Sequence, residues 1–154
     1  MTISLFVTKL VTVMAANSQF AVAIHVLAML AKSCDERIKS DYIAKSVNTN
    51  PVVIRRLLST LYENGLVVSQ TGMCGGSCLT RQAKDISLLE VYRTVSKGEV
   101  FALHPNTPDR HCSVGKNIQA VLEKLQSEID EAIEEKLAKY TLQDVIEMVE
   151  TEKV

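Results

Sequence analysis

Hydrophobic residues recur every three or four positions in the first part of the chain, which is the pattern of amphipathic helices. One stripe spans residues 18–31 and predicts a central helix, in which His25 is expected to be buried. A shorter stripe predicts a second helix over Asp41–Val47, and Ser40 is a suitable N-terminal cap for it. A charged break separates the two helices.

A third helix is predicted from Pro51 to about Asn64, because proline is tolerated in a first turn and Gly65 suits the left-handed residue that ends a helix. The residues on its apolar side follow the spacing i, i+3, i+4, i+7 and are Ile54, Leu57, Leu58 and Leu61. The opposite side carries small, hydrogen-bonding and basic groups, namely Asn50, Val52, Val53, Arg55, Arg56, Ser59 and Thr60. This second side is expected to remain outside the core.

A β-hairpin is predicted directly after this helix. Residues 66–70 and 77–81 have the composition of strands, and the glycine-rich segment 72–76 joins them. Arg81 and Lys84 at the base of the hairpin are expected to add positive charge.

The second half of the chain is predicted to be helical on either side of a loop. A helix opened by Asp85 or Ser87 runs to Ser96, and residues 98–112 indicate a loop because they hold two prolines among polar residues. A single long helix is expected over residues 113–140. At about 1.5 Å per residue it is about 40 Å long, which is more than a small domain needs for its own core.

Length and composition limit the architecture to one compact domain with one appended element. We expect a mainly α fold with a small β-hairpin, organised as a winged helix-turn-helix domain over residues 14–97, a loop over 98–112, and a long association helix with a C-terminal helix over 113–154. Residues 1–13 are expected to be an upstream extension, because Met14 stands directly before the first convincing helix. Their apolar run is too short to span a membrane.

Cysteine usage and the absence of catalytic motifs restrict the function. Four unevenly spaced cysteines do not suit a disulfide-stapled secreted domain, which favours a reducing, cytoplasmic setting. Aromatic residues make up 5% of the chain and tryptophan is absent, which disfavours an all-β sandwich. The sequence has no Ser–His–Asp order, phosphate-binding loop or dinucleotide fingerprint, so we do not expect an enzyme.

Charge is divided between the two halves of the chain. Residues 32–84 hold eight basic and four acidic residues, whereas residues 116–153 hold five basic and ten acidic ones. DNA phosphates demand positive charge only on the binding face, so this division favours a DNA-binding half beside an acidic association element. The alternative is that these charged residues only keep the surface solvated and contact no partner.

The third helix is predicted to be a recognition helix, with its N-terminal residues in the major groove. Asparagine can pair with adenine, arginine with guanine or phosphate, and valine with thymine methyl groups, although Asn50 can also be only a helix cap. Wing glycines allow a close approach of the backbone to DNA. The predicted DNA-binding residues are Ser40, Tyr42, Asn48, Asn50, Val52, Val53, Arg55, Arg56, Gln70, Thr71, Gly75 and Gly76.

Taken in order, several segments resemble the Rrf2 family of bacterial winged helix-turn-helix regulators, which includes the IscR, NsrR and CymR types. The matching segments are QFAVAIH at 19–25, the helix at 51–61, NGLV at 64–67, the wing GMCGG at 72–76 and DISLLEVY at 85–92. Residues 46–53 (SVNTNPVV) and 112–116 (CSVGK) resemble the YwnA-type branch most. The resemblance implies a homodimer held by the long helix and a palindromic operator in double-stranded DNA.

The chain departs from the family pattern in two places. Iron–sulfur sensors of the family carry three cysteines in the loop before the long helix, where this chain has only Cys112, so we expect no cluster and no other cofactor. Many members also place an arginine just before the wing glycine, where this chain has Gln70 and Thr71. Reading of the minor groove by the wing is therefore left open.

Three cysteines are candidate sensors. Cys112 stands beside Arg110 and His111 at the predicted start of the long helix, where the helix dipole and the cations favour the thiolate; a small residue that fills the loop is the alternative. Cys74 and Cys78 span the wing tip and could form a reducible disulfide if their β-carbons face each other. Metal binding by these cysteines and nearby histidines is a third interpretation, although the paired spacing of a zinc site is missing.

These observations predict a homodimeric, sequence-specific DNA-binding regulator, a repressor in the simplest case, with thiol chemistry as its input. The alternatives are a winged helix that binds protein, a metal-responsive member of the same family, and a small thiol oxidoreductase that uses Cys74 and Cys78. A steep loss of affinity with salt distinguishes DNA binding from protein binding.

Overall fold

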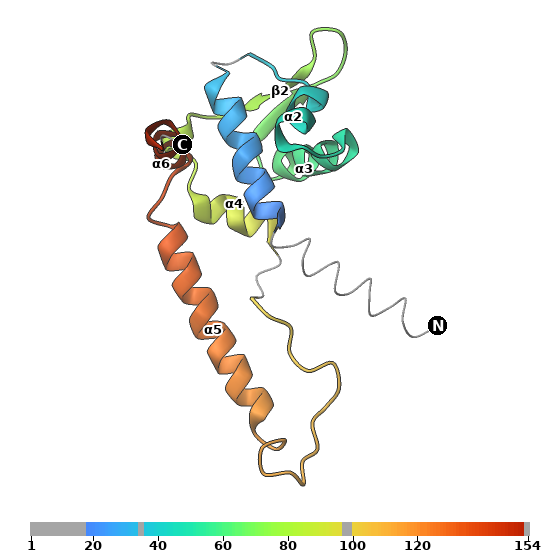
Figure 1. The fold of residues 1–154 in the computed structure, drawn as a ribbon, viewed down its shortest axis with the longest axis vertical. Coiled ribbons are helices and arrows are strands. Elements are labelled where there is room, and N and C mark those ends of the chain that lie inside the picture. The colour runs from blue at the N-terminus through green and yellow to red at the C-terminus, as the bar shows by residue number, and fades with distance from the viewer. Residues whose placement is uncertain (1–17, 34–35, 97–99, 153–154) are drawn as a thin grey trace, which may run out of the picture.

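The computed structural model describes residues 18–33, 36–96 and 100–152, so the extension expected at residues 1–13 lies outside the described residues. The elements, in chain order, are a first helix over residues 18–32, α2 (Ser40–Val47), α3 (Pro51–Glu63), β1 (Val67–Gln70), β2 (Gly76–Leu79), the short 3-10 helix η1 (Ala83–Asp85), α4 (Leu88–Val95), α5 (Ile118–Leu137) and α6 (Leu142–Thr151). The fold is mainly helical with one antiparallel two-stranded hairpin, and its arrangement is that of a winged helix-turn-helix (Figure 1). This confirms the predicted fold class.

One hydrophobic core joins the helices and the hairpin. The buried residues come from the first helix, from α2 to α4 and from α6, and the largest fully buried side chains are Leu27, Leu30, Ile43, Ile54, Leu61, Leu66, Ile86 and Leu142. The first helix is central, as its broad apolar stripe predicts. His25 is not part of this core: it is exposed, and its Nε2 lies 3.0 Å from Ser46 Oγ of α2. The expectation of burial is wrong because position 25 lies on the polar side of the first helix.

Helix caps determine the tight turn between α2 and α3. Asn48 adopts a left-handed conformation (φ 57°), and Asn50 Oδ1 accepts a hydrogen bond of 2.8 Å from the backbone N–H of Val52. Ser40 does not cap α2, because it is the first residue of that helix and Lys39 occupies the cap position without a side-chain bond. The Ser40 hydroxyl accepts a hydrogen bond from α3 instead, as described below.

The wing consists of β1, β2 and the loop that joins them, and it is fixed to the start of α2. Ile38 and Ser77 exchange two backbone hydrogen bonds of 2.9 Å, which place the segment before α2 along the outer edge of β2. Gly76 permits this approach: its φ is +145°, and a Cβ there would lie 2.8 Å from the carbonyl oxygen of Ile38. The wing and the helix-turn-helix therefore form one continuous surface.

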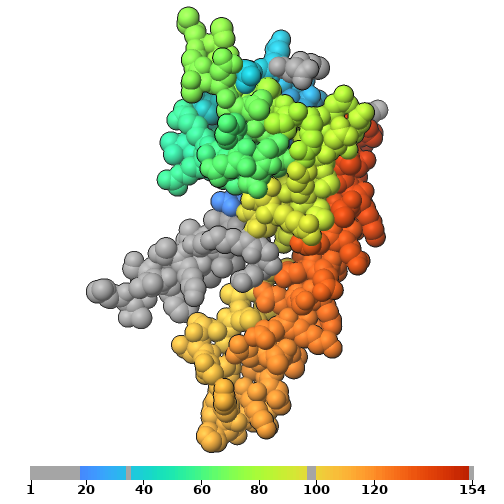
Figure 2. Space-filling model, turned by 180° about the vertical axis from the view of Figure 1, so that it is seen from behind, coloured from blue at the N-terminus to red at the C-terminus, as the bar shows by residue number. Residues whose placement is uncertain are grey.

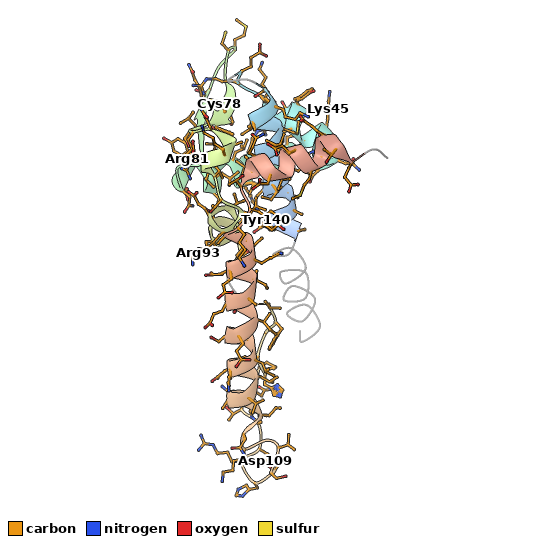
Figure 3. The ribbon with its side chains drawn as sticks, turned by 90° about the vertical axis from the view of Figure 1, so that its left-hand side faces the viewer. Lys45, Cys78, Arg81, Arg93, Asp109 and Tyr140 are labelled. Carbon is orange, nitrogen blue, oxygen red and sulfur yellow. The ribbon has the colours of Figure 1, made fainter. Side chains whose placement is uncertain are left out.

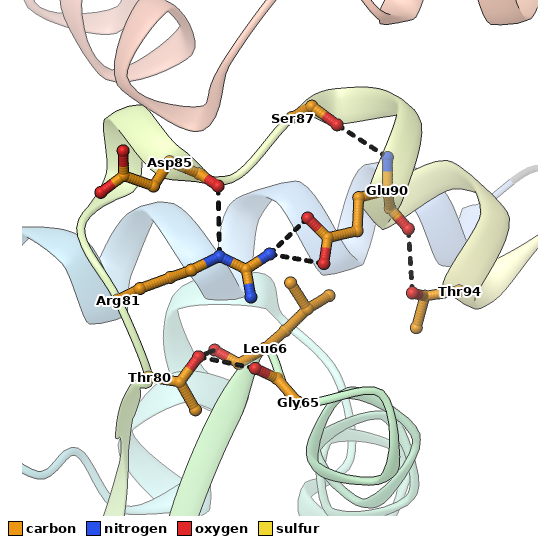
Figure 4. Close-up of polar contacts among 8 residues, drawn as sticks. All are labelled: Gly65, Leu66, Thr80, Arg81, Asp85, Ser87, Glu90 and Thr94. Atoms are coloured by element: carbon orange, nitrogen blue, oxygen red, sulfur yellow. Dashed lines mark hydrogen bonds and ion pairs between the residues drawn. The ribbon is translucent and has the colours of Figure 1, made fainter.

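Arg81 joins the base of the wing to α4 (Figure 4). Its Nε donates a hydrogen bond of 3.1 Å to the carbonyl oxygen of Asp85, and its Nη2 donates to both carboxylate oxygens of Glu90. Thr80 Oγ1 donates a further bond of 2.6 Å to Gly65 O. Arg81 is thus engaged in holding the fold together, and the expectation that it supplies charge for a partner is wrong.

Helix α5 stands off the body of the molecule, and residues 100–117 run alongside it; we call α5 and residues 100–117 the stalk (Figures 1 and 2). Gln126 Nε2 of α5 donates a hydrogen bond of 2.7 Å to Phe101 O, and this bond joins the two parts of the stalk. No residue of α5 is buried. No helix in the described part of the chain combines the length and the hydropathy that a bilayer crossing requires.

The helix of the stalk is shorter than predicted at both ends. It starts at Ile118 rather than at Ser113, because the preceding residues form tight turns in which the N–H of Lys116 donates to Cys112 O at 3.0 Å. It ends at Leu137. The last helix, α6, begins with a capping box, in which Thr141 and Asp144 exchange hydrogen bonds.

Candidate nucleic-acid interface

Helix α3 turns one side to the core and the other to solvent, as its sequence predicts. Its four buried residues are Ile54, Leu57, Leu58 and Leu61. On the opposite side Val52 and Val53 are each 49% exposed, and Arg55 and Arg56 are exposed as well. Large apolar side chains left half in solvent at the start of a helix are available to a partner.

This exposed side borders an open groove between α3, the start of α2 and the wing. The residues that line the groove are Lys39, Ser40, Asp41, Arg55, Leu58, Ser59, Tyr62, Ser69, Gln70, Thr71, Gly72, Gly75, Gly76 and Ser77. Six of the predicted DNA-binding residues are among them: Ser40, Arg55, Gln70, Thr71, Gly75 and Gly76. The fold therefore brings together residues that lie up to 36 positions apart in the sequence.

The remaining predicted residues do not line this groove. Val53 and Arg56 border a second hollow, between α3, the start of the first helix and the end of α4. Tyr42 is 64% exposed and borders a hollow beside Ile38 at the start of α2. Asn48 and Asn50 are exposed in the turn, where their backbone and side chain cap the two helices. Since Asn50 Oδ1 already accepts from Val52, pairing of Asn50 with adenine would require this cap to open.

Arg55 is held by two residues of α2. Its Nη2 lies 3.0 Å from Asp41 Oδ1, and its Nε donates a hydrogen bond of 3.2 Å to Ser40 Oγ. Asp41 was not predicted as part of the site, because no spacing rule links residues 14 positions apart on two different helices. The only feature of the sequence that pointed to Asp41 was its position as an acidic residue in the first turn of α2.

Arg56 differs from its neighbour. Its guanidinium has no hydrogen bond or ion pair with any residue in the described ranges, and its side chain is exposed on the opposite flank of α3. An unpaired guanidinium of this kind can move to meet a phosphate. The guanidinium of Arg55 is therefore held in place by α2, whereas that of Arg56 can change its orientation.

The wing glycines have an internal role. A Cβ on Gly75 would lie 2.4 Å from Gln70 O, so the loop could not close with any larger residue there. The wing from Leu66 to Thr80 holds no charged residue, and Met73 at its tip is 91% exposed. Positive charge near the groove therefore comes from Lys39 and the helices, and not from the wing.

The thiol of Cys112 lies in the turns that precede α5 and is exposed. Hydrogen bonds from the backbone N–H groups of Gly115 and then Val114 lower the pKa of Cys112 below its ordinary value of 9.0. The expected cause, the start of the long helix, is wrong because α5 begins only at Ile118. The thiolate is favoured by local amides and not by the helix dipole.

Cys74 and Cys78 are both free thiols. The strand register places Val68, and not Cys74, opposite Cys78. Figure 3 shows Cys78 in the wing and, at the far tip of the stalk, Asp109, which precedes Cys112 by three positions in the sequence. Within the described ranges, no three His, Cys, Asp or Glu side chains come together as a metal centre would require.

Comparison with known proteins identifies the fold and its use. The sequence profile of the Rrf2 family, described as iron-dependent transcriptional regulators, matches residues 16–148. The chain belongs to the Rrf2 family. The family consists of transcriptional regulators and not of enzymes.

Three relatives illustrate the similarity. YwnA of Bacillus subtilis (strain 168), which carries the name of an HTH-type transcriptional regulator, is 47% identical over 131 residues, or 84% of this chain and 96% of YwnA. A solved structure described as a DNA-binding protein is 40% identical with a TM-score of 0.67, over 83% of this chain and 98% of that chain. A structure from Lactobacillus plantarum, described as a transcriptional regulator, is 25% identical with a TM-score of 0.76, over 86% and 90% of the two chains.

The iron dependence in the Rrf2 family description does not fit the residues of this chain. Protein iron–sulfur clusters are held by several cysteine thiolates or by cysteine and histidine together. Here Cys112 is the single cysteine between residues 98 and 117, and the described residues contain no cluster of three potential ligands.

Proposed function

We propose that this Rrf2-family protein is a homodimeric repressor that binds a palindromic operator and responds to oxidation of a thiol. The observation that carries the proposal is the orientation of α3: four buried residues anchor it, while Val52, Val53 and two arginines remain exposed on its opposite side. The start of a recognition helix that enters the major groove carries this kind of surface.

The exposed residues of α3 support complementary tasks on a duplex. Val52 and Val53 can contact thymine methyl groups, and Arg55 and Arg56 offer donors to guanine or to phosphate. Gln70 and Thr71 at the end of β1 can reach the DNA backbone next to the major groove that α3 would occupy. Recognition of the base sequence thus depends on α3. The wing has no charged residue, so its contacts with DNA would not release counterions from the phosphates.

The stalk supports a dimer. Val121, Leu125 and Ile129 follow one another at four-residue spacing along α5 and are 51%, 45% and 39% exposed. A helix that buries none of its residues gains little stability in water, since most helical stability comes from packing of an apolar face. A second copy of the same stripe would cover it, as in a two-fold symmetric contact.

Two-fold symmetry of the protein implies an operator with the same symmetry. The half-sites of such an operator lie about 34–36 Å apart, one helical turn of DNA, or a multiple of this distance. A dimer on such a site excludes other proteins from the same DNA, which is the simplest mechanism of repression.

The input that we propose is oxidation or alkylation at Cys112. This thiol is exposed, and two backbone amides favour its reactive thiolate form. The stalk that carries Cys112 is also the element proposed to join the two copies, so a modification there would alter the spacing of the two α3 helices.

Selection of bound duplexes from a random-sequence library by the reduced protein tests this function. The expected result is enrichment of one inverted repeat, protected in a footprint at two half-sites, and its release after treatment with peroxide. Enrichment of no sequence would contradict the proposal, and binding that persists after oxidation would contradict the thiol input alone.

A further inference from the structure

Among the described residues that line the groove, Asp41 is the only one with a carboxylate, and it pairs with Arg55 on the surface proposed to meet DNA. The two side chains are 65% and 58% exposed, and their closest N···O distance is 3.0 Å. A carboxylate repels the phosphates and so weakens DNA binding. Its presence on a DNA-binding surface therefore calls for a function that offsets this loss of affinity. An exposed ion pair stabilises a fold very little, so stability is not a sufficient use.

The geometry of the pair leaves a specific part of Arg55 free. Asp41 Oδ1 and Ser40 Oγ accept from Nη2 and Nε, so α2 engages one edge of the planar guanidinium. The donors that remain are on Nη1 and Nη2, and they have no other partner among the described residues. Two N–H groups on one edge match the O6 and N7 acceptors of guanine in the major groove.

Comparison with Arg56 indicates which task suits each arginine. Phosphate contact needs charge and tolerates a mobile side chain, which describes the unpaired Arg56. Base reading needs a fixed orientation and less net charge, which describes Arg55 with Asp41 beside it. Orientation before binding also reduces the side-chain entropy that is lost when the contact forms.

We propose that Asp41 is a positioning residue for DNA readout: together with Ser40 it holds the guanidinium of Arg55 so that its free edge reads one guanine in each operator half-site. This inference rests on the proposed function. It assigns the two adjacent arginines to different parts of the duplex, Arg55 to a base and Arg56 to the backbone.

The test uses the duplex enriched by the wild-type protein and a set of variants in which each base pair of both half-sites is replaced in turn. Affinities are measured for the full-length wild type, Arg55→Ala, Asp41→Ala, Asp41→Asn and the control Arg56→Ala. The wild type should lose about 5- to 150-fold in affinity when the guanine read by Arg55 is replaced. Arg55→Ala should abolish this preference at that base pair and at no other.

Asp41→Ala should reduce the preference at the same base pair, and Asp41→Asn should retain part of it because an amide oxygen still accepts from Arg55. In the Arg55→Ala background, Asp41→Ala should cause no further loss of preference. Arg56→Ala should weaken binding to all duplexes by a similar factor. A merely structural role of Asp41 would change all base pairs alike.

Two results would overturn the inference while leaving the proposed function intact. One is an equal gain in affinity for every duplex in Asp41→Ala, which would make Asp41 only a repulsive group. The other is a wild-type preference at every base pair that survives in Arg55→Ala. If the wild type enriches no duplex, the proposed function fails and this inference fails with it.

Discussion

Arg93 of α4 and Glu134 of α5 are joined by two hydrogen bonds, 3.2 Å from Nε to Oε1 and 2.6 Å from Nη2 to Oε2. The two residues are 41 positions apart, and their contact fixes the base of the stalk to the DNA-binding body. The hydrogen bonds from Arg93 lower the pKa of Glu134, and the same contact raises the pKa of Arg93. The direction in which the stalk leaves the body thus depends in part on one ionised carboxylate.

Acid is therefore expected to weaken the attachment of the stalk. Because the pKa of Glu134 in the folded protein is below its ordinary value of 4.5, its ion pair contributes fully above that pH and is lost as pH falls through the folded pKa. Glu134→Gln should lower the unfolding temperature above about pH 5, and the difference from wild type should shrink at lower pH. Thermal unfolding at a series of pH values measures this effect.

Glu128→Gln is a matched control, because Glu128 is also on α5 and its ion pair in the described part of the chain is a long one, 3.8 Å to Lys124. Asp144 also has a lowered pKa, because the backbone N–H and then the hydroxyl of Thr141 bond to it. It is present in the wild type and in both variants, so its titration affects all three proteins alike. An unfolding-temperature difference between Glu134→Gln and wild type that does not change with pH would argue against a role for ionised Glu134.

Disruption of the apolar stripe on α5 should separate the dimer. Leu125→Glu places a charge in the middle of the stripe, where burial against a second copy would be unfavourable. Sedimentation equilibrium should give twice the chain mass for wild type and the single chain mass for the variant. Ala120→Glu is the control, because it adds the same charge on the opposite side of the helix. Equal dissociation of both variants, or a dimer that survives Leu125→Glu, would contradict the proposed contact.

The turn around Cys112 should determine the reactivity of its thiol. In a chain whose other cysteines are replaced by serine, alkylation by iodoacetamide should show a pH midpoint below 9.0. Gly115→Ala should raise the midpoint, because a Cβ there would lie 2.3 Å from Asp109 O and the amides that favour the thiolate would have to move. A midpoint that is the same in both proteins would show that the amides do not control the thiol.

Two wing glycines should differ in their tolerance of alanine. Gly72 has a φ of +101° with open space around it, so Gly72→Ala should cost about 1–2 kcal/mol in the free energy of unfolding. Gly76→Ala should cost about 3 kcal/mol or more, because the added Cβ meets the backbone of Ile38 as well. Urea denaturation measures both, and equal costs would contradict the close packing at Ile38.

The sequence predicted the elements of the DNA-binding half well, because each depends on local chemistry. Leu57, Leu58 and Leu61 follow helical spacing, Asn50 caps its own helix, and Gly65 ends it in a left-handed conformation. The start of α5 was misplaced because no local pattern reveals the close approach of Gly115 to Asp109, which holds residues 113–117 in turns.

Contacts between distant side chains could not be predicted in this way. Ser40 was expected to cap α2, but it bonds to Arg55, and Arg81 was expected to add positive charge at the base of the hairpin, but it bonds to Glu90. His25 was expected in the core and instead meets Ser46. Each of these pairs joins two elements whose packing angle no local spacing reveals.

The central claim, that the exposed side of α3 meets the DNA backbone and bases, is tested most directly by the salt dependence of binding to the enriched duplex. Each phosphate contact contributes about 0.9 to the slope of log K against log salt concentration, so Arg56→Ala should reduce the slope of a dimer by about 2. Lys124→Ala, which removes an exposed cation from the stalk, should leave the slope unchanged. A folded Arg56→Ala protein with wild-type affinity and slope would contradict the account.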